Sequence, residues 1–247
     1  MTARVSVVIP VYDEGEEIRV VLDRLFEGVA LPCEVLVVYD RPDDSTVPIL
    51  QEYVQSEDRV RPVLNDYGSG PANAIRFGID NAEADVVVVT MADGSDDPRQ
   101  IDDLTRLVER GVVVAAASRY GPGGQQVGGP ALKSLLSRLA GLSLYWFARI
   151  GTRDATNSFK AYNRDFVRRV GIDSRTGFEI GLELTVKARR LRLPVAEFPT
   201  IWLERQVGVS NFNVISWVPH YLAWYFFAFG PKLTLEQLHE RAPGRGR

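Results

Sequence analysis

The sequence contains a single cysteine and only two histidines among its 247 residues. A lone Cys33 excludes an internal disulfide and a multi-cysteine metal site, which favours an intracellular protein. The histidines, His220 and His239, both lie close to the C-terminal end, so neither a histidine-based catalytic triad nor a zinc centre is expected. A formal net charge of -3 argues against general nucleic-acid binding.

The sequence also lacks an apolar run long enough to cross a bilayer. Its most hydrophobic stretch, residues 214–229, is rich in Trp, Tyr and Phe, yet as a helix it spans only about 24 Å, against about 30 Å for a bilayer core. Pro219 and His220 lie at its middle. These features predict a helix that lies in the plane of a membrane interface, with packing against the domain or a partner as the alternative.

Alternating strands and helices are predicted for most of the remaining chain. Such alternation implies right-handed crossovers and an α/β fold with a mainly parallel, Rossmann-like sheet flanked by helices. We expect three regions: a catalytic domain over residues 1–212, an amphipathic interfacial helix over 213–230 and a flexible tail over 231–247. Apolar patterns place strands at residues 5–10, 34–39, 60–64, 86–89, 112–117 and 194–203, and later helices at 131–150 and 178–191.

Four consecutive valines, residues 86–89, form the most apolar of these strands and lead into an acidic turn. A strand of this kind is buried on both faces at the centre of a parallel sheet. Asp93, Asp96 and Asp97 follow it at the carboxyl end of the sheet, where ligands bind in open α/β folds. Carboxylates there are suited to hold a divalent cation and, through it, a diphosphate. The alternative is a polar turn that caps the helix beginning near Pro98.

Seven segments of the chain occur in the order and rough spacing of a known enzyme family: Val8-Ile-Pro-Val-Tyr-Asp-Glu14, Val37-Val-Tyr-Asp40, Gly68-Ser-Gly-Pro-Ala72, Met91-Ala-Asp93, Ser118-Arg-Tyr120, Asp154-Ala-Thr-Asn-Ser-Phe-Lys-Ala-Tyr162 and Glu204-Arg-Gln-Val-Gly-Val-Ser210. Through them the chain resembles the family 2 glycosyltransferases from about residue 4 to residue 229, and within them the polyprenyl-phosphate sugar synthases of the dolichyl-phosphate mannose synthase group. This resemblance implies a GT-A fold, a nucleotide-sugar donor, a lipid-phosphate acceptor and inversion at the anomeric carbon.

The resemblance assigns donor binding to residues at the ends of the first strands. Pro10, Tyr12 and Glu14 suit the binding of a base and ribose, although an acid such as Glu14 is also common at a helix N-terminus. Asp40 matches the position that hydrogen-bonds the base, whereas Asp44 in the same loop has turn formation as its alternative role. The remaining donor-binding residues are Gly70, whose backbone can pass close to the nucleotide at a helix N-terminus, and Ala92 and Asp93 in the acidic turn.

The metal site implied by the resemblance departs from the family pattern at one position. Asp93 matches the metal-binding acid of the Asp-x-Asp turn, but Met91 replaces the first acid. A thioether is a poor ligand for Mg²⁺ or Mn²⁺, which prefer oxygen. Mg²⁺ often takes only one or two carboxylates together with phosphates and water, so we expect Asp93 to bind Mg²⁺ or Mn²⁺ with help from Ser95 or Asp96.

Arg119, Lys133, Ser137 and Arg205 fall where the family faces the lipid phosphate or the donor diphosphate. Arginine and lysine form charge-assisted hydrogen bonds to phosphate, and Ser137 adds a donor. A lipid phosphate is already anionic, so its attack on the sugar needs alignment and charge stabilisation but no catalytic base. Asp93, Arg119 and Arg205 are therefore the expected catalytic residues.

We expect transfer of mannose from GDP-mannose to a polyprenyl phosphate, with glucose from UDP-glucose as the next candidate. The expected location is the cytoplasmic face of a membrane, with a membrane-anchor subunit or a second copy as a possible partner. One alternative is transfer to a hydroxyl group, which requires a base such as Glu183 or Asp96. Another, suggested by Met91, is a catalytically impaired nucleotide-binding scaffold.

Overall fold

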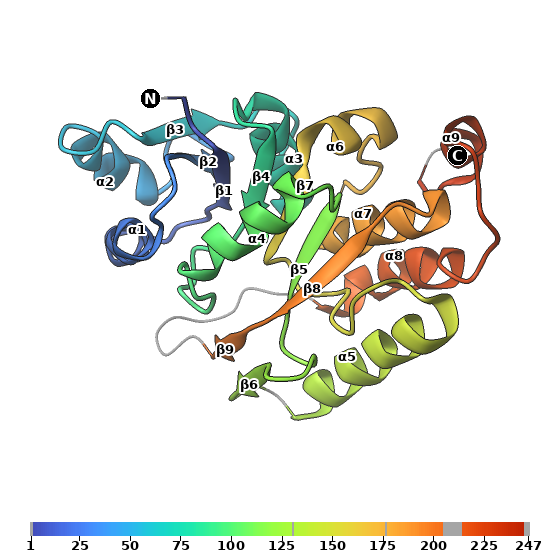
Figure 1. Cartoon of the computed structure of the whole chain (residues 1–247). Coiled ribbons are helices and arrows are strands. Elements are labelled where there is room, and N and C mark those ends of the chain that lie inside the picture. The colour runs from blue at the N-terminus through green and yellow to red at the C-terminus, as the bar shows by residue number, and fades with distance from the viewer. Residues whose placement is uncertain (1, 130, 176, 205–213, 245–247) are drawn as a thin grey trace.

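A computed structural model of the chain describes residues 2–129, 131–175, 177–204 and 214–244, and its centre is a seven-stranded sheet (Figure 1). The strand order is β3-β2-β1-β4-β7-β5-β8, and every pairing in this sheet is parallel except the two made by β7. A second, two-stranded sheet pairs β6 with β9. The strands are β1 (Val5–Pro10), β2 (Cys33–Tyr39), β3 (Val60–Leu64), β4 (Val86–Val89), β5 (Val114–Ser118), β6 (Gln125–Val127), β7 (Lys160–Asn163), β8 (Val195–Pro199) and β9 (Ile201–Leu203).

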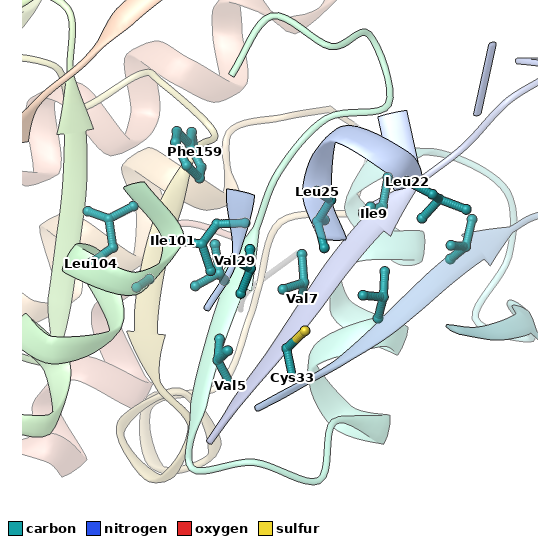
Figure 2. Packing of buried hydrophobic residues seen from close by; sticks show 14 of the residues in the cluster. Val5, Val7, Ile9, Leu22, Leu25, Val29, Cys33, Ile101, Leu104 and Phe159 are labelled. Atoms are coloured by element: carbon teal, nitrogen blue, oxygen red, sulfur yellow. The ribbon is translucent and has the colours of Figure 1, made fainter. Parts of the chain in front are cut away.

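Helices cover both faces of the large sheet. Because successive side chains of a strand point to opposite faces, Val7 and Ile9 pack on one side, while Val8 packs on the other. Figure 2 shows the first side, where Leu22 and Leu25 of α1 lie over β1. The helices are α1 (Glu17–Gly28), α2 (Thr46–Tyr53), α3 (Pro71–Asn81), α4 (Gln100–Glu109), α5 (Ala131–Ser143), α6 (Arg164–Val170), α7 (Ile180–Leu191), α8 (Val214–Phe227) and α9 (Leu235–Arg241), with a π-helical turn η1 (Leu144–Ala148) after α5.

The central strands are buried on both faces, which confirms the prediction made from their continuous apolar sequence. All six residues of β1 and all four valines of β4 are buried, as expected for a parallel sheet covered on both sides. On the far face α3 approaches β1 so closely that a Cβ at Gly78 would lie 2.4 Å from Val8 Cγ1. Glycine at this position therefore allows the helix to pack directly on the sheet.

Strand β7 enters the sheet in the opposite direction to its two neighbours. Lys160 pairs with Val89 at the end of β4 and with Ala116 of β5, whereas Asn163 pairs with Val86 at the start of β4. The first residue of β7 therefore lies at the edge where the parallel strands end. The irregular segment before β7 is brought to that edge, between the ends of β4 and β5.

Two predicted elements are divided in the structure. The single strand predicted over residues 194–203 is β8 and β9, which belong to different sheets and are separated by the buried Thr200. The helix predicted over 131–150 is α5 followed by η1, and it ends where Arg149 adopts a left-handed conformation with φ of 55°. Leu144 and Ala148 of η1 are buried against Trp224 of α8 and against Ala228, the residue directly after α8.

The C-terminal region is more ordered than the sequence predicted. A flexible tail was predicted over 231–247, and this prediction is wrong for the part that forms α9. Leu238 of α9 is fully buried with residues of α6 and α7. Thr234 begins this helix with a capping box in which its side chain accepts from Gln237 N and the Gln237 side chain accepts from Thr234 N. Leu233 N also donates to Arg190 O at 2.8 Å, which ties the segment to α7.

Helix α8 lies where the interfacial helix was predicted. Trp224 is buried against the domain, while Val218, Leu222 and Phe226 are exposed. Within the described ranges, none of the helices is both long enough and apolar enough to span a bilayer. One face of α8 thus packs on the domain, and contact of the other with a membrane stays a prediction.

The burial of α9 predicts that Leu238→Ala lowers the free energy of unfolding by about 2–5 kcal/mol, because it leaves a cavity between α9 and α7. Leu235→Ala is the matched control, since Leu235 lies on the same helix but is exposed. Denaturant unfolding of both variants measures the difference. Equal, small losses would show that α9 does not contribute to the core.

Candidate functional site

Candidate site residues from four separate segments gather at one edge of the large sheet. Since β1, β2, β4 and β5 run in the same direction, their carboxyl ends meet there. Pro10 ends β1 and Asp40 follows β2, while Asp93 and Arg119 follow β4 and β5. The predicted donor and phosphate residues in these loops therefore lie at the same edge of the sheet.

Asp40 links the end of β2 to the glycine loop before α3. Its Oδ2 accepts a 2.6 Å hydrogen bond from Gly70 N, and its Oδ1 accepts a 2.8 Å bond from Asn65 Nδ2. Gly70 has a φ of 117°, a conformation that strains any residue with a side chain. The carboxylate of Asp40 therefore shapes the loop and retains acceptor capacity for a ligand.

The loop after β1 presents an exposed aromatic ring next to a cation. Tyr12 is 54% exposed, and the Arg41 guanidinium carbon lies 4.9 Å from the centre of its ring. Arg41 also forms an ion pair with Asp13, which holds it in place. A flat aromatic and guanidinium surface of this kind is suited to contact a nucleotide base.

Asp44 and Thr46 join the loop after β2 to the loop after β1. Asp44 accepts from Asp13 N at 3.0 Å and from Thr46 N at 2.8 Å, and it is almost fully buried. Thr46 Oγ1 accepts from Glu14 N at 3.1 Å. The turn-forming role considered for Asp44 is therefore what the structure shows, and these bonds fix the backbone that carries Tyr12 and Glu14.

The acidic turn after β4 holds its carboxylates by local hydrogen bonds. Asp93 Oδ1 accepts from Ser95 N at 3.0 Å and from Ser95 Oγ at 2.6 Å. Asp96 Oδ2 accepts from Thr90 Oγ1 at 2.9 Å and from Met91 N at 3.4 Å. Burial, followed by the negative charge of Asp93, raises the pKa of Asp96 to about 7. Ala92, which directly precedes Asp93, is buried.

This turn fits a cation that takes few protein ligands. Across the described residues no group of three or more His, Cys, Asp or Glu side chains is placed to hold a metal, in keeping with Met91 in place of an acid. Within the same residues the bonds from Ser95 occupy Asp93 Oδ1 and leave Oδ2 for a cation. A Mg²⁺ or Mn²⁺ ion bound here would complete its shell with diphosphate oxygens and water.

Arg119 is held by a bidentate ion pair with Asp154. Its Nε and Nη2 donate to the two carboxylate oxygens at 2.7 and 2.9 Å, and its backbone N donates to the same carboxylate at 2.9 Å. Asp154 is fully buried, and the Arg119 side chain is 14% exposed. Asp154 thus uses only part of the guanidinium's five donors and fixes the direction in which the others point.

Asp154, Asn157 and Lys160 belong to one of the segments that carry the family resemblance, but the sequence predicted no role for them. Lys160 is fully buried, and its Nζ donates to the carbonyls of Ala155, at 3.1 Å, and Asn157. Burial lowers its pKa to about 7. Asn157 Nδ2 in turn donates to Ala117 O at 3.0 Å, which closes the segment against β5.

The predicted acceptor residues are only partly described. Ser137 Oγ and Thr156 Oγ1 share a 2.8 Å hydrogen bond, which joins α5 to the segment before β7. Lys133 lies in α5, but its side chain is outside the described part of the structure, as is the whole of Arg205. The structure therefore brings Ser137, Asp154 and Arg119 to one edge, and the placement of the other two cations stays a prediction.

Glu183 is not available as a catalytic base. It lies in α7, is fully buried and accepts from Asp173 N at 2.6 Å and Ser174 N at 2.8 Å. Lys187 Nζ, also fully buried, donates to it at 2.6 Å. The candidate role of Glu183 in proton removal is therefore wrong, because its carboxylate is used inside the fold.

Comparison with known proteins finds both a family and individual relatives. The model for "Glycosyl transferase family 2" matches residues 6–171. Polyprenol monophosphomannose synthase of Mycolicibacterium smegmatis is 30% identical over 219 residues, which cover 86% of this chain and 82% of the relative. Undecaprenyl-phosphate mannosyltransferase of Micrococcus luteus is 28% identical over 216 residues, which cover 85% of this chain and 88% of the relative.

Solved structures share the fold at lower sequence identity. Glucosyl-3-phosphoglycerate synthase of Mycobacterium tuberculosis, in complex with Mn²⁺, UDP and glucosyl-3-phosphoglycerate, has a TM-score of 0.67 at 16% identity, covering 94% of this chain and 82% of the other. The mannosyltransferase PcManGT of Pyrobaculum calidifontis, in complex with GDP-Man and Mn²⁺, has a TM-score of 0.63 at 19% identity. The match covers 92% of this chain and 64% of the other. The likeness confirms the expected GT-A fold.

The buried ion pair predicts that Asp154→Ala lowers the free energy of unfolding by about 3–5 kcal/mol, because it leaves the Arg119 charge buried without its partner. Asp165→Ala is the control, since it removes one partner of an exposed pair with Arg169 and is expected to cost at most about 1 kcal/mol. Urea unfolding compares the two. Similar losses would contradict the assignment of Asp154 as the internal anchor of Arg119.

Proposed function

Because the chain belongs to glycosyl transferase family 2, we propose that it transfers a hexose from a nucleoside-diphosphate sugar to a polyprenyl phosphate, with inversion at the anomeric carbon. Mannose from GDP-mannose is the first candidate, supported by the names of two relatives and by the GDP-Man bound to one structural neighbour. The observation that carries the proposal is the pairing of an acidic turn at Asp93 with a fixed guanidinium at Arg119 along one sheet edge.

In this reaction the acceptor phosphate needs no proton removed before it attacks. Its anionic oxygen displaces the nucleoside diphosphate from the anomeric carbon, and the new bond forms on the face opposite the leaving group. The buried Glu183 therefore has no part in the step. The chain's task is to align two negatively charged substrates and to offset their repulsion.

Donor binding is divided among the loops at the carboxyl ends of β1, β2 and β4. Tyr12 with Arg41 offers a surface for the base, and Asp40 with Gly70 forms the loop that approaches the nucleotide. Asp93, oriented by Ser95, would hold Mg²⁺ or Mn²⁺, which when bound neutralises charge on the diphosphate. Both structural neighbours carry Mn²⁺, in support of this cofactor.

Acceptor binding is assigned to the cations and hydroxyl on the other side of the acidic turn. Arg119 is directed by Asp154, and Ser137 is held near the same segment through Thr156. Lys133 and Arg205 complete the proposed set. Charge-assisted hydrogen bonds from such groups hold a phosphate oxygen toward the anomeric carbon.

Membrane attachment is proposed through one apolar surface. Its described members on α5 and η1 are all exposed, and Ser143 Oγ shares a 2.8 Å hydrogen bond with Tyr225 of α8, so the two helices lie together. An amphipathic surface of this kind binds at the boundary between head groups and acyl chains, at the cytoplasmic face in this proposal. We name it the apolar surface, and it consists of Leu135, Leu136, Leu139, Trp146, Phe147, Val218, Leu222 and Phe226.

A panel of nucleotide sugars, each offered with a lipid phosphate or a soluble hydroxyl acceptor, separates this function from its alternatives. We expect turnover with GDP-mannose and lipid phosphate. Turnover with hydroxyl acceptors alone would contradict the proposal and direct attention to Asp96, which lies in the site. Nucleotide binding without any turnover would favour the impaired scaffold suggested by Met91.

Asp93→Ala is expected to reduce transfer about a hundredfold or more, because it removes the proposed ligand of the cation that stabilises the leaving group. Asp97→Ala is the matched control in the same turn, since Asp97 bonds only locally to Arg99 in the described structure. Initial rates at several Mn²⁺ concentrations compare the variants. Full metal-dependent activity of Asp93→Ala would remove Asp93 from the metal site.

Lys133→Ala is expected to raise the KM for lipid phosphate at least tenfold and to leave nucleotide binding unchanged, because its charge is assigned to the acceptor. Arg138→Ala removes a charge from the exposed side of the same helix and serves as the control. Steady-state kinetics and nucleotide titration separate the two substrates. A loss of nucleotide affinity of the same size would place Lys133 on the donor side.

Phe147→Ser is expected to weaken binding to vesicles about tenfold or more, because a phenylalanine buried in lipid contributes about 1.5–3 kcal/mol. Phe147 is 78% exposed in the described structure, and Val20→Ser on α1, at 61%, is the control. Co-sedimentation with phosphatidylcholine vesicles measures both. If the two variants bind as the unmodified protein does, the proposed attachment surface is wrong.

A further inference from the structure

A cavity of about 420 Å³ lies away from the site described above. Its apolar lining comes from Ile150, Leu193 and Val195, and its polar lining from Arg149, Arg189 and Arg192. Val195 begins β8 and pairs with Val114 at the start of β5, whereas Arg119 follows the other end of β5. The cavity is therefore at the amino end of these strands, opposite the edge that carries Asp93 and Arg119.

The positive charge of this cavity is not balanced by acidic side chains. In the parts of the chain that the structure describes, none of the three arginines forms an ion pair with a carboxylate. Arg189 Nε instead donates to the backbone carbonyl of Ala148. Burial, and then the neighbouring charges of Arg192 and Arg149, lower the pKa of Arg189. Three like charges thus face one cavity in a chain whose net charge is -3.

Two helix ends offset only part of this charge. Arg149 follows η1 and Arg192 follows α7, and both adopt the left-handed conformation that closes a helix, with φ of 55° and 56°. A helix C-terminus carries about half a negative charge, so two ends supply about one, against three arginines. The remainder is close to two positive charges, which favours an anionic ligand such as a lipid phosphate.

The cavity adjoins the apolar surface. Arg149 comes directly after η1, and three residues before it Trp146 is 66% exposed, followed by Phe147. Helix α5 begins with the proposed acceptor residues and continues through η1 to Arg149. The apolar surface therefore runs from the acceptor end of this helical segment to the arginine cavity at its other end.

We propose that Arg149, Arg189 and Arg192 bind the phosphate of an anionic membrane lipid and so fix the C-terminal end of the α5–η1 segment to the bilayer. This inference rests on the membrane attachment proposed above, but not on the identity of the donor or acceptor. A lipid source is favoured over a free phosphate because exposed aromatic residues, which suit the membrane interface, border the same cavity. Apolar contact and charge then hold the helical segment parallel to the membrane.

The test is co-sedimentation of the full-length chain with phosphatidylcholine vesicles that contain or lack phosphatidylglycerol. The double variant Arg149→Gln/Arg192→Gln is expected to lose about 30-fold in binding to the anionic vesicles, since each arginine near such a surface contributes about fivefold. Binding to neutral vesicles is expected to stay unchanged. Both residues are exposed, and a melting curve checks that the variant is folded.

Arg110→Gln/Arg168→Gln is the matched control, because it removes the same charge from exposed positions on α6 and at the end of α4. An equal loss in this control would overturn the proposal by showing a general charge effect. A second arm measures protection against thermal unfolding by glycerol 3-phosphate. Arginine-dependent protection together with unchanged vesicle binding would assign the cavity to a soluble phosphate and contradict the lipid.

A further control keeps this result distinct from the proposed transfer reaction. Activity toward a short, water-soluble polyprenyl phosphate is expected to be the same in the arginine double variant and in the unmodified protein. A loss of that activity would show that the cavity belongs to the catalytic machinery and would overturn its assignment as a membrane contact. Absence of transfer in the unmodified protein would instead contradict the proposed function and leave the vesicle result standing.

Discussion

The antiparallel pairing of β7 between β4 and β5 is the constraint on which the site depends. It reverses the chain once within an otherwise parallel sheet, so the segment from Asp154 to Lys160 arrives at the edge where β4 and β5 end. Asp154 then meets Arg119 in a buried, bidentate pair. Without this insertion, the acidic turn after β4 and the guanidinium after β5 would lack the segment that holds them at a fixed separation.

Charge separation along this edge is how, in the proposed reaction, a chain of net charge -3 would bring two anions together. Negative charge is concentrated after β4, where Asp93 is held by Ser95 and the pKa of Asp96 is raised to about 7. Positive charge lies at Arg119, which follows β5 on the other side of β7. In the proposed reaction, a cation held on the acidic side and the Arg119 guanidinium on the other side would supply the neutralisation that each phosphate needs.

The sequence predicted the parallel core and the acidic turn because local patterns encode them. Four consecutive valines followed by an acidic turn are typical of a central parallel strand, and all four valines are buried. The order of the strands is not local, so nothing in the spacing showed that β7 would run antiparallel. Glu183 could be considered as a base in the alternative reaction for a related reason: its surroundings come from Lys187 and from the backbone of Asp173, which only the folded chain brings around it.

The C-terminal segment contained a signal that was passed over. Thr234 and Gln237 have the spacing of a capping box, and Leu238 follows directly, which together indicate a packed helix rather than a mobile tail. The arginine cavity, by contrast, was not predictable, since Arg149 and Arg192 end different helices and meet only through tertiary packing. Sequence patterns thus located most of the core strands and helices, while α9, β6 and the way the elements combine became clear only in the fold.

The central claim is that an anionic phosphate attacks the sugar without a catalytic base. Its most direct test offers labelled GDP-mannose with either a polyprenyl phosphate or the corresponding polyprenol of the same chain length. We predict that label enters the lipid phosphate and that the alcohol is not used, because the proposed mechanism assigns no group to remove its proton. Transfer to the alcohol at a comparable rate would contradict the account, since it would require a base in the site.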